Sequence, residues 1–104
     1  TMTTKFVQVL CDVDCEWQDV SPRYRITVNG ELFTERTWIW RDAYLEEIIP
    51  IEAEPGIYKI DFSMVNDGVQ GKIITSNFRV GVGDGTVVAP NTVEIMPYEV
   101  TRNL

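Results

Sequence analysis

The 104-residue chain contains no histidine, and only nine lysines and arginines stand against sixteen aspartates and glutamates. The missing imidazole excludes Ser-His-Asp and Cys-His catalysis, a histidine proton shuttle and a histidine-ligated metal. The formal net charge of −7 removes the electrostatic basis for binding nucleic-acid phosphates or an anionic membrane surface. We therefore expect no nucleic-acid partner and no membrane partner.

Long apolar runs are also missing. The longest spans only a few residues, far below the roughly 20 needed to cross a bilayer, and no apolar segment of signal-peptide length follows residues 1–5. Hydrophobic residues nevertheless make up 44% of the chain, which is enough for a packed core, and 104 residues correspond to one domain. We expect a soluble protein of intracellular origin.

Cysteine is scarce: Cys11 and Cys15 are the two in the chain, three residues apart. On an extended strand they lie roughly 13 Å apart, whereas a disulfide needs Cα atoms within about 7 Å, so they could pair only if residues 12–14 formed a turn. Two thiolates also fall short of the four ligands of a structural zinc site. The spacing predicts two free thiols, with Cys11 packed as a small apolar side chain.

Most of the remaining sequence has a period of two. Apolar and polar residues alternate over residues 5–13 and 23–28, which is typical of half-buried strands. Asn29-Gly30 follows the second run directly and precedes residues 31–34. Because a type I′ turn needs positive φ at both central residues, Asn-Gly between two such runs predicts a β-hairpin.

Further strands are predicted over residues 37–41, 44–53, 57–65, 72–82 and 92–96, with turns at 54–56 and 66–68. A helix is the alternative for residues 43–49, but Pro50 would end it and the isoleucines favour a strand.

Turn residues recur roughly every 10 positions between these short segments, which predicts an all-β fold. We expect an antiparallel β-sandwich, jelly-roll-like or immunoglobulin-like, with about seven or eight short strands. Gly83-Asp84-Gly85 interrupts the alternation. We therefore place the β-sandwich domain at residues 1–83 and a C-terminal extension or edge strand at residues 84–104.

A cluster of acidic residues is the candidate metal site: Asp12, Asp14, Glu16 and Asp19. Alternate side chains of an extended chain point the same way, and oxygen ligands at that spacing suit Ca²⁺, the one cofactor we consider. The cluster lacks the glycine and the terminal glutamate of an EF-hand loop. Solvated charges beside a loop are therefore the alternative interpretation.

The candidate binding residues are Trp38 and Trp40, with Arg36 and Arg41 beside them. On a strand the two tryptophans would share one face. If exposed, they would form a protein–protein contact surface, in which Trp and Arg are enriched, or a flat platform for sugar rings. The third interpretation is that both rings fill the core, as large aromatic side chains usually do.

Catalytic patterns are missing. Glu46 and Glu47 are adjacent, so on a strand they point to opposite faces and cannot flank one glycosidic bond. No serine lies in a nucleophile elbow, and the glycines at 81, 83 and 85 do not have the spacing of a dinucleotide-binding loop. We expect that the protein is not an enzyme.

Residues 21–47 read SPRYRITVNGELFTERTWIWRDAYLEE, and residues 54–60 read EPGIYKI. This stretch resembles small uncharacterised β-sandwich-like proteins encoded by tailed phages of marine cyanobacteria. The resemblance covers residues 21–60, implies an accessory or structural role in the virion, and supplies no active-site residues. It would place the protein in the host cytoplasm or in the virion.

Together these observations lead us to expect a non-catalytic structural or protein-interaction module that self-assembles through edge strands and the C-terminal tail. Its partners would be further copies of itself or other virion proteins. The alternative is a carbohydrate-binding module, assisted by calcium, with a glycan as its ligand.

Overall fold

The computed structural model describes residues 4–40, 43–65 and 71–97. In these ranges the chain is all-β, with eight strands and no helix, and therefore no helix that could cross a membrane. The strands are β1 (Lys5–Trp17), β2 (Arg23–Val28), β3 (Glu31–Thr37), β4 (Leu45–Ala53), β5 (Gly56–Met64), β6 (Gly71–Val82), β7 (Gly85–Ala89) and β8 (Thr92–Ile95).

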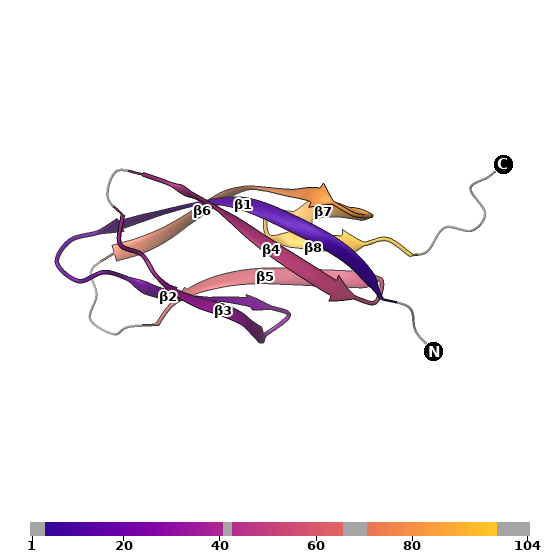
Figure 1. The fold of residues 1–104 in the computed structure, drawn as a ribbon, viewed down its shortest axis with the longest axis horizontal. Coiled ribbons are helices and arrows are strands. Elements are labelled where there is room, and N and C mark those ends of the chain that lie inside the picture. Colours follow the sequence, from indigo (N-terminus) through magenta and orange to yellow (C-terminus); the bar gives the residue numbers. More distant parts are fainter. Residues whose placement is uncertain (1–3, 41–42, 66–70, 98–104) are drawn as a thin grey trace.

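The strands form two antiparallel sheets (Figure 1). One sheet has three strands in the order β4-β1-β6, and the other has five in the order β3-β2-β5-β8-β7. The all-β prediction and the predicted number of strands are thereby confirmed, and residues 45–53 form a strand rather than the alternative helix.

The hairpin of β2 and β3 has the predicted turn. Asn29 has a φ of 49° and Gly30 a φ of 84°, both in the left-handed region that the type I′ turn requires. The Asn29 side chain also accepts a hydrogen bond from the Lys59 amide at 2.7 Å and donates one to the Ile57 carbonyl at 3.0 Å. Asn29 therefore both shapes the turn and ties it to β5.

The core receives alternate side chains of β1, as the period of two predicts. Val7, Val9, Cys11 and Val13 are completely buried. They belong to one hydrophobic cluster with side chains of the other sheet, namely Tyr24, Ile26, Ile60, Val93 and Ile95. The two sheets therefore share a single core.

The two cysteines lie on one continuous strand. β1 continues as a strand through residues 12–14, and Cys11 and Cys15 are free and buried, as predicted.

The predicted strand over residues 37–41 is wrong, because β3 ends at Thr37 and residues 38–40 lie outside the sheets. The reason is tertiary: the Trp38 amide binds the Pro22 carbonyl at 2.8 Å, and its ring enters the core.

The region predicted as an extension or edge strand contributes two strands. β7 lies at the edge of the five-stranded sheet, and β8 lies between β7 and β5. Val93 and Ile95 of β8 are completely buried. The turn predicted at residues 66–68 and the segment 98–104 fall outside the described residues.

Candidate functional site

Exposed apolar side chains gather in two loops at one end of the molecule. The loops are β1–β2, which exposes Val20, and β3–β4, which exposes Ile39, Trp40 and Tyr44. Both lie at the end opposite to the N-terminus (Figure 1). We call the surface formed by these four residues the loop end.

Hydrogen bonds hold the loop end in place. The indole N–H groups of Trp17 and Trp38 both donate to the carbonyl oxygen of Trp40, at 2.8 Å and 2.9 Å. The bond from the Trp38 amide to Pro22 joins the two loops. The Trp40 ring meets the Trp38 ring edge-on, with centroids 5.1 Å apart. The exposed Trp40 side chain therefore projects from a backbone position that hydrogen bonds hold in place.

A buried carboxylate lies behind this surface. Glu47 of β4 is only 2% exposed, and its Oε2 accepts a hydrogen bond from the Tyr24 hydroxyl at 2.9 Å. Arg36 forms an ion pair with the same oxygen at 2.7 Å. The Tyr24 ring also lies against Trp38, with centroids 6.5 Å apart. The Glu47 charge is therefore satisfied by one group from β2 and one from β3.

Burial is the main cause of the raised pKa values of Cys11, Cys15 and Tyr24. It raises the pKa of Cys11 to about 12, with the Glu47 and Asp12 carboxylates adding to the shift. It raises the pKa of Cys15 to about 11, with Asp14 adding. Burial and the hydrogen bond to Glu47 also raise the pKa of Tyr24. Both thiols are therefore protonated at neutral pH, which is unsuited to nucleophilic chemistry or metal ligation.

The four predicted binding residues have different surroundings. Trp38 is completely buried, whereas Trp40 is 43% exposed. Their ring planes are 74° apart, so they do not form the shared flat face predicted from a strand. Arg36 is engaged with Glu47, and Arg41 lies outside the described residues.

Sequence reasoning missed Trp17 and Glu47 as members of this region. Trp17 reaches Trp40 from the far end of β1, 23 positions away, and no local pattern signals that contact. The alternation of residues 45–53 does put Glu47 on the same face as Ile49. Its partners come from the other sheet, however, and depend on how the sheets pack.

One member of the predicted acidic cluster, Asp12, belongs to an ion-pair network on the outer face of β1. Asp12 pairs with Arg79 at 3.4 Å and accepts a hydrogen bond from the Asn77 amide at 3.2 Å. Arg79 also pairs with Glu46. Asp14 and Glu16 follow on the same face of the strand, and Asp19 lies in the β1–β2 loop. In residues 4–40, 43–65 and 71–97, no group of three or more potential ligand side chains could hold a metal ion.

Comparison with protein-family models, curated proteins and solved structures found no match for this chain. The function is therefore inferred from the residues of the chain itself.

Proposed function

We propose that this chain is a non-catalytic protein-interaction module that associates with further copies of itself through the loop end. The observation that supports this most directly is the 43% exposed Trp40 on a loop anchored by two indole hydrogen bonds. Tryptophan is enriched among the residues that dominate binding energy. A side chain that is ordered before binding also loses little conformational entropy in the complex.

The character of the loop end suits association of an acidic protein. Two chains of net charge −7 repel each other, so a stable contact needs a patch without acidic groups at its centre. Val20, Ile39, Trp40 and Tyr44 are all uncharged, whereas the exposed Asp19 next to Val20 carries an acidic group at the margin of this surface. A structural role in a virion, implied by the resemblance, is the setting that we propose for such an assembly.

We further propose that the two sheets form an immunoglobulin-like sandwich. In that fold, strands B and E pair in one sheet and strands C and F pair in the other. Here β1 pairs with β4 in one sheet, and β2 pairs with β5 in the other. This interlocked order favours an immunoglobulin-like over a jelly-roll-like layout. Loops at the end of such a sandwich are a common place for binding.

Light scattering on the wild-type chain and on Trp40→Ala tests the proposed function. We expect a mass above the 11.9 kDa of one chain for the wild type and a clearly lower mass for Trp40→Ala. Leu32→Ala is the matched control, because Leu32 is exposed but lies beside the hairpin turn rather than at the loop end. An assembly that survives Trp40→Ala unchanged would refute the loop end as the contact.

A carbohydrate-binding module is the second candidate, supported by the two exposed aromatic rings of Trp40 and Tyr44 at the loop end. Exposed aromatic faces can stack on sugar rings. A glycan screen with the wild-type chain and Trp40→Ala distinguishes the two functions. Glycan binding by a monomeric wild type, lost in Trp40→Ala, would favour this candidate over self-association.

A further inference from the structure

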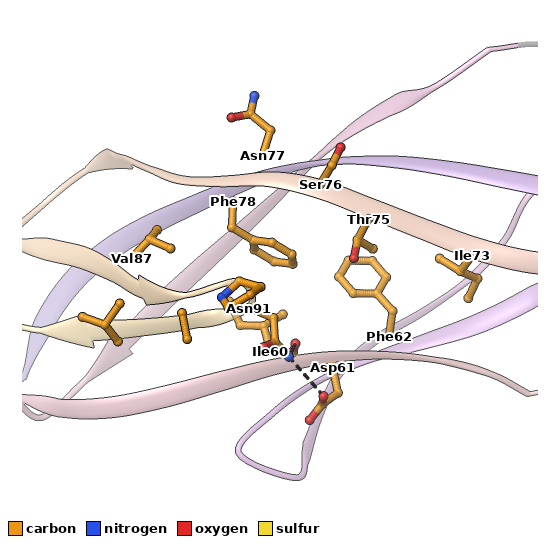
Figure 2. Close-up of a pocket in the computed structure, with 13 residues that line it drawn as sticks. Ile60, Asp61, Phe62, Ile73, Thr75, Ser76, Asn77, Phe78, Val87 and Asn91 are labelled. Atoms are coloured by element: carbon orange, nitrogen blue, oxygen red, sulfur yellow. Dashed lines mark hydrogen bonds between the residues drawn. The ribbon is translucent and has the colours of Figure 1, made fainter.

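A groove of about 670 Å³ lies on the side of the molecule between β5, β6 and the turn that joins β7 to β8 (Figure 2). Phe62 of β5 and Phe78 of β6 point toward one another across it and meet edge-to-face, with centroids 6.4 Å apart. Ile60 and Ile73 add to its apolar lining. Among the described residues that line it, Asp61 is the one that carries a charge.

The groove exists because β5 is paired unequally on its two sides. β2 pairs with Ile60–Met64, whereas β8 pairs only with Gly56–Lys59. The β8 ladder stops at Asn91, whose carbonyl accepts from the Ile60 amide and whose side-chain amide donates to the Ile60 carbonyl, both at 2.8 Å. Beyond Ile60, the described residues place no strand on this side of β5.

The direction of the backbone groups follows from the antiparallel ladder, in which successive residues face alternate sides. Lys59 bonds Asn29 on the β2 side, and Ile60 bonds Asn91 on the β8 side. Phe62, which lines the groove, and Met64 beyond it therefore direct their N–H and C=O groups to the open side of β5, where the described chain has no partner strand for them. Apolar side chains beside unpaired strand groups are the features that recognise an extended peptide.

The sequence contains a segment of the matching chemistry. Residues 98–104 read Tyr-Glu-Val-Thr-Arg-Asn-Leu, in which Tyr98, Val100 and Leu104 alternate with polar residues. Tyr, Val and Thr favour strands.

The length of this segment favours a second copy over the same chain. Ile95 pairs with Gly56, at the end of β5 remote from Phe62. Returning from Gly56 to Phe62 takes about 20 Å of extended chain, which is nearly the whole reach of seven residues at about 3.3 Å each.

We propose that the groove accepts residues 98–104 of a second copy as an added strand beside residues 61–64 of β5. This inference rests on the proposed self-association and names a second surface for it. The contact joins two different surfaces, so successive copies would extend an assembly rather than close a two-fold dimer.

The test compares Val100→Asp with Thr101→Asp in the full chain, by light scattering. The residues are adjacent and both β-branched, but in the proposed added strand only position 100 would face the groove. Burying a charge there is costly, so Val100→Asp is expected to weaken association about tenfold or more, and Thr101→Asp to change it less than about twofold. Equal effects at both positions, or an effect at neither, would overturn the added strand.

A synthetic peptide of residues 98–104, added to the Val100→Asp chain, locates the acceptor by amide NMR. The expected result is that the amide signals of Phe62 and Met64 shift. Shifts confined to the loop end, or none, would overturn the groove as the acceptor. Trp40→Ala separates this inference from the proposed function: if it dissociates the assembly while Val100→Asp does not, self-association stands and the added strand fails. A monomeric wild type would refute both.

Discussion

The loop end and the groove both present apolar side chains, but their backbones differ. At the loop end, the Trp40 carbonyl already accepts two indole donors, and the side chains project outward. In the groove, the rings of Phe62 and Phe78 are recessed, and backbone groups of β5 face the opening without a partner strand in the described residues. The first arrangement suits contact with a preformed surface, and the second suits addition of an extended strand.

Replacing Trp38, whose ring lies beneath the loop end, should lower the free energy of unfolding most. Trp38→Ala deletes a completely buried ring that also donates to the Trp40 carbonyl, so the free energy of unfolding should fall by about 3–5 kcal/mol. Urea unfolding followed by circular dichroism measures the change. Trp40→Ala is the comparison and should cost about 1 kcal/mol or less, because its ring is partly exposed. Similar losses of unfolding free energy in both variants would contradict the assignment of Trp38 to the core and of Trp40 to the surface.

The buried carboxylate behind the loop end should be the next most sensitive point. Arg36→Ala leaves Glu47 buried with the Tyr24 hydroxyl as its hydrogen-bond partner among the described residues, and should lower the free energy of unfolding by about 2–4 kcal/mol. Arg25→Ala is a matched control, because Arg25 pairs with the more exposed Glu35 and should cost about 1 kcal/mol or less. If the two arginine variants unfold at the same urea concentration, the Glu47 network does not stabilise this region.

Alkaline pH should weaken the fold by a smaller and gradual amount. The pKa of Cys11 is about 12 in the folded chain, above the usual value of about 8.5 expected when unfolded. A raised folded pKa favours the native state below the unfolded pKa, and this contribution disappears as pH rises through the folded value. The free energy of unfolding should therefore fall from about pH 9 upward. Cys11→Val should reduce that slope, and an unchanged slope would contradict the assignment.

Removing divalent cations with EDTA should change stability and association least, because Asp12 of the predicted metal site is engaged by Arg79 and Asn77. EDTA should leave the Tm and the solution mass unchanged. A Tm that rises with added Ca²⁺ would instead establish a cation site, since a ligand that binds the native state stabilises it.

Local pattern predicted the strands and the hairpin well, because alternation and Asn29-Gly30 act through neighbouring residues. It failed at residues 38–40, where aromatic and β-branched composition favoured a strand but packing of Trp38 into the core prevailed.

The candidate site could be predicted from the sequence less well than the strands. The groove depends on β8 ending its pairing at Asn91, which is a property of the whole sheet. The contact of Trp17 with Trp40 likewise requires the packed sheets. Such long-range geometry leaves no periodic signal in the sequence.

The most direct test of the central claim is the solution mass of the wild-type chain, measured by light scattering over a tenfold range of concentration. Self-association through the loop end and the groove predicts a mass above 11.9 kDa that increases with concentration. A mass of one chain at every concentration would contradict it.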